Sequence, residues 1–160
     1  MYGTMEKIVI REAVMSDMGS LLVFEQGVLQ AERPFDDTIK DNTRYYNLPE
    51  MIAAPHIQLL VAEQEGQLIG SGYARIETAK HFLKYRQFAY LGFMYVPPAH
   101  RGKGVNKLII DALAQWAVTK GITELRLEVY VGNTPAIKAY EKAGFSKLLV
   151  EMRLGLGEND

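Results

Sequence analysis

Residues 96–107 read VPPAHRGKGVNK, and this stretch decides how the rest of the chain is interpreted. Gly102 and Gly104 let the backbone turn tightly, so that several amide N–H groups can point into one concavity. If a helix begins here, its unpaired N–H groups and its dipole also favour a negative charge. The stretch adds positive charge through Arg101, Lys103 and Lys107. It therefore predicts an anion site, most naturally for phosphate; the alternative is a surface turn that happens to be basic.

The segments on either side favour the phosphate site. Residues 88–96 (FAYLGFMYV) are nearly all apolar, which is typical of a strand covered on both faces. From Val105 to Ala117 the apolar residues recur at spacings of three and four, as in an amphipathic helix. The P-loop form GxxxxGK[ST] and the dinucleotide form GxGxxG are both absent. Another kind of phosphate-bearing ligand is therefore expected.

The remaining pattern predicts a mixed α/β chain. A length of 160 residues fits one domain, and we expect a single domain over 1–160. A tight turn at Glu65-Gly66 joins two of the strands. The predicted strands are 8–10, 57–63, 68–76, 88–96, 125–131 and 145–152. Helices are predicted at 18–28, at 105–117 and between Thr134 and Gly144, with one or two short helices around loops within 30–55.

Composition excludes several classes of protein. Apolar residues make up 48% and charged residues 23%, as in soluble globular proteins, and the net charge of -1 argues against nucleic acid or an anionic membrane as the main partner. The absence of cysteine excludes disulfides and thiolate metal sites, and the three histidines lack the spacing of metal ligands, so we expect no metal. Without a signal peptide or a long apolar run, we expect a cytoplasmic protein.

Two motifs resemble those of the GNAT superfamily of N-acetyltransferases. Residues 101–106 (RGKGVN) resemble motif A, [Q/R]-x-x-G-x-[G/A], although Asn106 stands where the family usually has Gly or Ala. Residues 127–145 (LEVYVGNTPAIKAYEKAGF) resemble motif B, L-x-V-x-x-x-N-x-x-A-x-x-x-Y-x-x-x-G-F. The motifs follow in the family order. The resemblance covers 57–152 as an acetyl-CoA-binding core and leaves 16–55 as the variable helical part that binds substrate.

The resemblance implies a mixed, mostly antiparallel sheet with flanking helices, in which the parallel strands 88–96 and 125–131 splay apart. Acetyl-CoA would lie between these strands as the co-substrate. Its pantetheine arm would pair with the main chain of Met94, Tyr95 and Val96, and an N–H near Met94 or Tyr95 would polarise the thioester carbonyl. The remaining cofactor-binding residues implied by the motifs are Arg101, Gly102, Lys103, Gly104, Val105, Asn106, Lys107 and Asn133.

The implied reaction is direct attack of a primary amine on the thioester in a ternary complex. Tyr140, at the tyrosine of motif B, is the expected general acid for the departing sulfur; the alternative is a tyrosine that packs on Ala136 and Phe145. Glu128 is the expected base, with a solvent-facing charge as the alternative. Asn133 can contact CoA, cap a helix, or do both.

Carboxylates beside aromatic residues in the variable part suit a cationic amine, and Glu32 and Phe35 are the expected acceptor-binding residues. The other carboxylates of this group are Glu25, Asp36 and Asp37. An exposed acidic loop is an equal alternative, and the acceptor can be a small amine, an amino acid, a peptide N-terminus or a lysine side chain.

Two other functions stay open at this stage. A non-catalytic acyl-CoA-binding or sensing module would need the glycine loop but neither Tyr140 nor a base. A nucleic-acid-binding domain would use the basic patch, although aromatic residues are not interleaved with it. Dimerisation is common in the family, so the resemblance also allows a homodimer.

Overall fold

The computed structural model describes residues 7–157 and divides them into two compact units, one ending at Glu128 and the other beginning at Val129. The first unit contains β1 (Val9–Glu12), η1 (Met15–Asp17), α1 (Met18–Glu32), η2 (Arg33–Phe35), α2 (Leu48–Ala53), β2 (Ile57–Gln64), β3 (Gln67–Thr78), β4 (Gln87–Tyr95), η3 (Pro98–His100), α3 (Val105–Thr119) and β5 (Leu125–Arg126). The second unit contains α4 (Thr134–Lys142). No helix in the described part of the chain is long and apolar enough to cross a membrane.

The strands of the first unit form one sheet in the order β1-β2-β3-β4-β5. The first four strands pair antiparallel, and β4 pairs with β5 in parallel. The predicted turn between β2 and β3 is confirmed, since Glu65 and Gly66 both have positive φ, of 53° and 76°. Such a two-residue turn matches the twist of a hairpin. The sheet is therefore mixed and mostly antiparallel, as expected.

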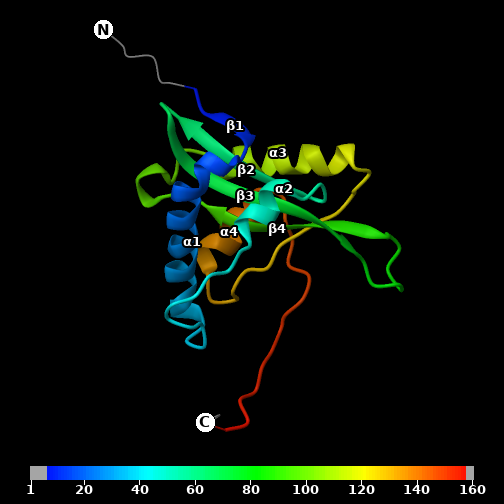
Figure 1. The fold of residues 1–160 in the computed structure, drawn as a ribbon. Coiled ribbons are helices and arrows are strands. Elements are labelled where there is room, and N and C mark those ends of the chain that lie inside the picture. Colours follow the sequence, from blue (N-terminus) through cyan, green and yellow to red (C-terminus); the bar gives the residue numbers. More distant parts are fainter. Residues whose placement is uncertain (1–6, 158–160) are drawn as a thin grey trace. The chain divides into compact units, whose positions relative to one another are not determined.

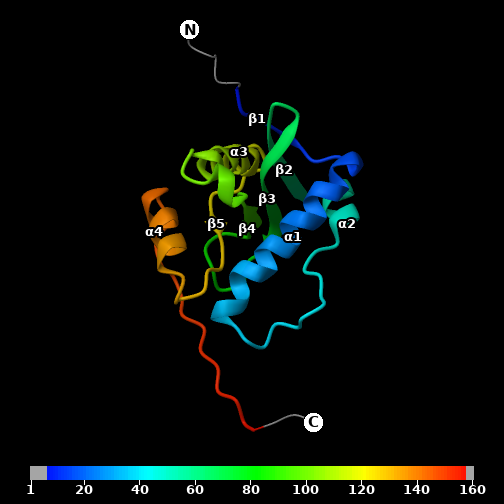
Figure 2. The same cartoon turned by 90° about the vertical axis from the view of Figure 1, so that its left-hand side faces the viewer.

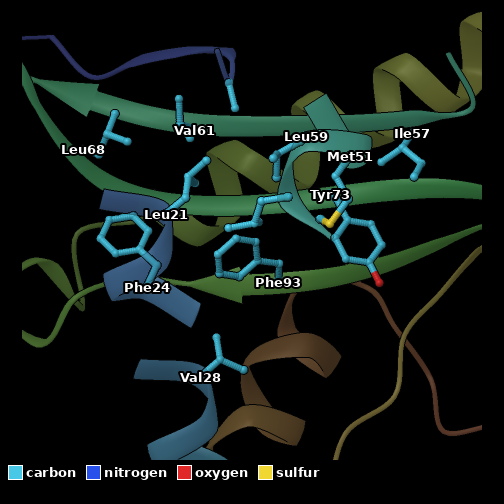
Figure 3. Close-up of a cluster of buried hydrophobic side chains, with 12 residues drawn as sticks. Leu21, Phe24, Val28, Met51, Ile57, Leu59, Val61, Leu68, Tyr73 and Phe93 are labelled. Atoms are coloured by element: carbon cyan, nitrogen blue, oxygen red, sulfur yellow. The ribbon is translucent and has the colours of Figure 1, made fainter. Parts of the chain in front are cut away.

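Helices cover both faces of this sheet (Figures 1 and 2). On one face, α1 and α2 close a cluster of buried side chains that includes Leu21, Met51 and Phe93 (Figure 3). On the other face, α3 approaches β3 at two glycines. A Cβ at Gly70 would lie 2.8 Å from Val105 Cγ1, and one at Gly72 would lie 2.8 Å from Ile109 Cγ2. The missing side chains on β3 thus allow close helix–sheet packing.

The helix α1 also approaches the end of β4 through a glycine. A Cβ at Gly27 would lie 2.5 Å from Tyr95 Cζ, so the tyrosine ring occupies the space of the missing side chain. Phe24, one turn earlier, packs on the same ring with 5.2 Å between ring centroids. The last residue of β4 is therefore held in place by one face of α1.

The structure differs from the sequence-based prediction at two places. The strand predicted at 125–131 is limited to Leu125–Arg126, and 145–152 forms no strand in the described structure. A strand needs a paired neighbour, and the register between β4 and β5 ends at Tyr90 and Arg126. Between β3 and β4, residues 79–86 form a loop closed by a hydrogen bond of 2.8 Å from Ala79 N to Arg86 O.

Candidate active site

A β-bulge interrupts β4 shortly before the glycine loop. In the register with β3, Ser71 faces Tyr95 and Tyr73 faces Gly92, so Phe93 and Met94 together oppose Gly72. Phe93 has a φ of 52°, a conformation that L residues rarely adopt. Bulges and unusual backbone conformations of this kind concentrate near functional sites. The bulge therefore marks the end of β4, where the pantetheine-binding residues were predicted.

On the opposite edge of β4 the register is much shorter. Its register with β5 comprises two pairs, Ala89 with Leu125 and Tyr90 with Arg126. Within residues 7–157, the register with β5 does not extend to Leu91–Tyr95. This is a parallel strand pair at the place where the resemblance implied one. An open strand edge presents N–H and C=O groups that an extended ligand can use as an added strand.

The loop after β4 ends at an uncapped helix. Gly102 and Gly104 both have a φ of 79°, and nothing would lie within 4 Å of a Cβ at either position. Gly104 is the N-cap of α3 and provides no side-chain hydrogen bond to the first turn. The N–H groups at the start of α3 are therefore not capped by a side chain of residue 104, which suits an anion such as pyrophosphate.

The positive side chains of this loop have partners of their own. Arg101 Nε donates to Val96 O at 2.8 Å, and its guanidinium lies 5.9 Å from the centre of the Tyr95 ring. Lys107 Nζ forms an ion pair of 2.8 Å with Asp111 on the exposed face of α3. Lys103 is exposed. Arg101 and Lys107 therefore have partners within the chain, whereas the first turn of α3 receives no side-chain cap from residue 104.

Glu128, the predicted base, lies at the end of the first unit beside β4. It is exposed, and its Oε1 accepts a hydrogen bond of 2.8 Å from the hydroxyl of Tyr90. Burial, followed by this hydrogen bond, raises the pKa of Tyr90. Tyr90 is therefore a neutral donor at physiological pH. The contact connects Glu128 to β4 just beyond the last β4–β5 pair.

Aromatic rings continue from Tyr90 across the face covered by α1. The Tyr73 and Tyr90 ring centroids are 6.3 Å apart, and the Arg75 guanidinium lies over both rings, at 5.5 and 5.3 Å. Arg75 also pairs with Glu77 at 2.5 Å. Burial raises the pKa of Tyr73 as well. Near Glu128 there are therefore two tyrosine rings and an arginine whose charge is balanced by Glu77.

The predicted acceptor-binding residues lie at the end of α1. Glu32 Oε2 accepts a hydrogen bond of 2.6 Å from the Tyr45 hydroxyl, and Phe35 is 38% exposed in η2. Glu25 does not fit the prediction of a carboxylate facing an amine. It is fully buried, and its Oε2 accepts hydrogen bonds from the backbone N–H groups of Tyr45 and Tyr46, at 3.0 and 2.8 Å. Glu25 instead fixes the loop to α1.

The second unit carries the other two predicted residues. Asn133 is the N-cap of α4, and its Oδ1 accepts a hydrogen bond of 3.4 Å from Ala136 N. The predicted capping role is therefore observed. Tyr140 lies on α4 with its ring edge-on to Phe145, 5.7 Å between centroids, and Phe145 N donates to Tyr140 O at 3.0 Å. This is the packing contact given as the alternative for Tyr140, and its role as general acid stays a prediction.

Two surface hollows lie elsewhere on the first unit. One of about 550 Å³ is lined by residues of the β3–β4 loop between Thr78 and Gln87. Another of about 340 Å³ lies between α2, β2 and the side chains of Trp116 and Lys120. None of the predicted site residues lines either hollow. The candidate site is thus defined by backbone geometry at the end of β4.

Sequence analysis missed the residues on β3 that face the bulge. Ser71 is fully buried, and its Oγ donates to Phe93 O at 2.9 Å. A Cβ at Gly72 would lie 2.6 Å from Met94 Sδ, so Met94 lies across this glycine. The signal was available in the run Gly70-Ser71-Gly72, because glycines inside a strand pattern indicate a bulge or a close approach.

A mixed sheet with a bulge near the end of β4 thus leads, through a loop with two glycines of positive φ, into the start of α3. The chain matches the model of the Acetyltransferase (GNAT) family over residues 25–145 and belongs to this family. It is 30% identical to the thialysine N-epsilon-acetyltransferase of Bos taurus over 147 residues, which cover 88% of this chain and 85% of that protein. The chain is therefore an N-acetyltransferase of the GNAT type.

Solved structures agree with this fold. A predicted acetyltransferase from Clostridium acetobutylicum, determined with acetyl-CoA, superimposes with a TM-score of 0.70 at 21% identity, covering 94% of this chain and 97% of that one. Glucosamine-6-phosphate N-acetyltransferase from Arabidopsis thaliana superimposes with a TM-score of 0.69 at 21% identity, covering 95% and 100%. At this level of identity the structures show the shared fold.

Proposed function

We propose that this chain transfers an acetyl group from acetyl-CoA to a primary amine by direct attack in a ternary complex. The observation that carries the proposal is the end of β4, where a bulged strand with one open edge leads into the uncapped start of α3. An extended thioester and its pyrophosphate need these two features side by side. In a non-catalytic acyl-CoA-binding module, neither Tyr140 nor Glu128 would be required.

In this proposal the main chain holds most of the donor. Met94, Tyr95 and Val96 pair with the pantetheine arm as an added strand would. The N–H groups from Gly102 to Lys107 bind the pyrophosphate, and the half-buried Asn106 contributes its backbone while its side chain adjusts. Asn133 keeps its capping role and can also contact CoA through its amide nitrogen.

The chemistry needs one base, one acid and one oxyanion donor. The amine nitrogen attacks the thioester carbon while its proton passes to Glu128, directly or through water. The carbonyl oxygen gains negative charge, which an N–H at Met94 or Tyr95 stabilises. The C–S bond then breaks, and the sulfur takes the phenolic proton of Tyr140. The products are the acetylated amine and CoA with its free thiol.

For the acceptor, we propose an amine that binds between the end of α1 and the Tyr90–Glu128 contact. Glu32 and Phe35 supply a carboxylate and an exposed ring, and Glu32 is already oriented by Tyr45. A carboxylate beside an aromatic surface favours a cationic group. The relative from Bos taurus is named for thialysine, so an amino-acid side-chain amine comes first among the candidates.

The test is a panel of amines incubated with acetyl-CoA, with free thiol release as the readout. The panel contains thialysine, lysine, glucosamine-6-phosphate, a peptide with a free N-terminus and a peptide with an internal lysine. We expect thiol release above the hydrolysis background for at least one amine, and none for its N-acetylated form. Acetyl-CoA binding without thiol release across the panel would instead support the non-catalytic binding module.

A further inference from the structure

A hydroxyl on β3 contacts the peptide at the centre of the bulge. Ser71 Oγ donates a hydrogen bond of 2.9 Å to Phe93 O, and both residues are buried, at 0% and 2% exposure. Phe93 is also the residue with the unusual φ of 52°. Since the carbonyl is removed from water, this hydrogen bond satisfies an acceptor that would otherwise be costly to bury.

The direction of this bond determines the direction of a neighbouring donor. The carbonyl of Phe93 and the N–H of Met94 belong to the same peptide group, which is planar, and the described chain contains no cis peptide bonds. In a trans peptide the C=O and the N–H point in opposite directions. When Ser71 fixes the carbonyl oxygen, it therefore also fixes the line along which the Met94 N–H points.

The same bond changes the strength of the donor. A hydrogen bond accepted by a carbonyl polarises its peptide group, and this strengthens the hydrogen bond that the peptide N–H can donate. Two further contacts hold the bulge without acting on this peptide. The Phe93 ring packs on Tyr46 at 4.6 Å between centroids, and Met94 lies across Gly72. Ser71 is thus the contact that acts on the peptide group itself.

We propose that Ser71 is a positioning residue for acetyl transfer. It aims the Met94 N–H at the thioester oxygen and makes this N–H a stronger hydrogen-bond donor. The inference rests on the proposed function, in which acetyl-CoA lies along β4, and selects Met94 from the two N–H groups considered there. Ser71 itself touches the peptide and not the substrate.

The experiment uses acetyl-CoA labelled with ¹³C at the thioester carbonyl. Its stretching frequency falls when a hydrogen bond polarises the carbonyl, so infrared difference spectra of the bound donor report the Met94 N–H without any turnover. We expect a clear downward shift in the parent protein and the loss of most of it in Ser71→Ala. Turnover should fall about tenfold, below the 10²–10³-fold typical of losing a whole oxyanion donor. Acetyl-CoA affinity, measured by calorimetry, should change by less than about threefold (roughly 0.7 kcal/mol).

Two further variants separate positioning from simple loss of stability. Ser71→Cys keeps the shape of the side chain with a somewhat larger atom and replaces the hydroxyl with a weak S–H donor, so its carbonyl frequency should lie between those of the parent and Ser71→Ala. It also serves if Ser71→Ala fails to fold. Leu113→Ala removes a fully buried side chain of α3, which should lower stability while leaving the carbonyl frequency unchanged.

The outcomes distinguish this inference from the proposed function. If acetyl-CoA binds the parent but its carbonyl frequency is the same in Ser71→Ala and Ser71→Cys, the role of Ser71 is wrong and the proposed function stands. An equal loss of the shift in Leu113→Ala would also overturn it. If acetyl-CoA does not bind the parent at all, the proposed function itself is wrong.

Discussion

The two edges of β4 differ in how much of the strand is paired. Toward β3 the register runs from Gln87 to Tyr95 and is interrupted by one bulge, whereas toward β5 it comprises two pairs. Hydrogen bonds on the first edge fix the backbone of the strand. The second edge, with its shorter register, is where the proposed function places acetyl-CoA. Pairing with β3 therefore fixes the backbone of β4 along most of its length, whereas pairing with β5 involves only its residues Ala89 and Tyr90.

The largest effect is expected for Tyr140→Phe, which concerns the edge of β4 toward β5, where the proposed function places the thioester. Tyr140→Phe removes the phenolic proton and keeps the ring that packs on Phe145. General acid catalysis contributes about 10²–10⁴-fold, so turnover should fall toward that range with little change in acetyl-CoA affinity. Steady-state rates and calorimetry on the same preparations measure both quantities.

The same variant offers an internal control for Tyr140. An acyl donor whose leaving thiol has a lower pKa needs less protonation, so the loss of turnover should shrink with that donor. A rate within a few-fold of the parent on a true substrate would show that Tyr140 serves packing alone.

Gly92→Ala tests the edge of β4 that pairs with β3. A Cβ at Gly92 would collide with the hydroxyl and ring of Tyr73, which lies across this glycine from β3. Overpacking of this kind costs about 1–3 kcal/mol, and we expect a loss of that size in the free energy of unfolding by urea. The double variant with Tyr73→Leu should recover part of it. A single variant as stable as the parent would mean that the β3–β4 pairing can yield.

Gly104→Asp tests the loop into which β4 leads. Apart from the residue itself and its chain neighbours, no described atom lies within 4 Å of the added Cβ, but the φ of 79° strains any side chain there. The aspartate adds to this strain a negative charge beside the phosphates. We expect acetyl-CoA affinity to fall at least about tenfold, or about 1.4 kcal/mol. Gly104→Asn is the matched control, because asparagine has a similar shape and tolerates a positive φ without the charge. Equal affinity for the two variants would exclude an electrostatic effect.

Glu128→Gln examines the residue beside the open edge. Glutamine keeps an oxygen that can accept the hydrogen bond of Tyr90, so the fold should be retained. If Glu128 takes the proton of the amine, turnover should fall most on the acidic side of the pH–rate profile, where free amine is scarce. Glu77→Gln provides a control, since that carboxylate is paired with Arg75. A profile unchanged from that of the parent would leave water as the base.

The smallest expected effect is a pH dependence of stability that comes from buried tyrosines on or near β3 and β4. Burial raises the pKa of Tyr46, Tyr73 and Tyr90 above the ordinary value near 10, so these groups stay neutral in the fold and ionise on unfolding. Stability is therefore complete below about pH 10 and falls as the pH rises, by up to about 1.4 kcal/mol per pH unit for each group. In Tyr90→Phe, the free energy of unfolding by urea, measured between pH 9 and 11, should fall less steeply with pH, by a slope that corresponds to at most one proton. An unchanged slope would contradict the raised pKa of Tyr90.

The sequence predicts those features that depend on local pattern. The turn at Glu65 and Gly66, the helix from Val105 and the strand before the loop follow from residue type and spacing, and the structure confirms them. The length of β5 and the bulge could not be predicted in the same way, because both depend on which strands pair and where pairing stops. Phe93 carries no sequence mark of its positive φ.

Burial explains the remaining differences at the candidate site. Glu25 was grouped with Glu32 as a carboxylate for an amine, since both lie among charged and aromatic residues. Only tertiary packing separates them: Glu25 faces the loop backbone from the inner side of α1, and Glu32 meets Tyr45 near the end of the helix. The roles of Tyr140 and of the pyrophosphate loop rest on motif and chemistry, and the experiments above test them.

The close approach of Gly27 to Tyr95 limits how this enzyme can change over evolution. Any side chain at position 27 would displace the ring at the end of β4, and Phe24 is tied to the same ring. With the acceptor site proposed above, we expect acceptor specificity to vary through the outer face of α1 and the residues that follow it, where Val23 is 68% exposed and Phe35 is 38% exposed. The helix divides into one face that tolerates variation and one that does not, and a mutational scan of α1 should recover this division with the period of a helix.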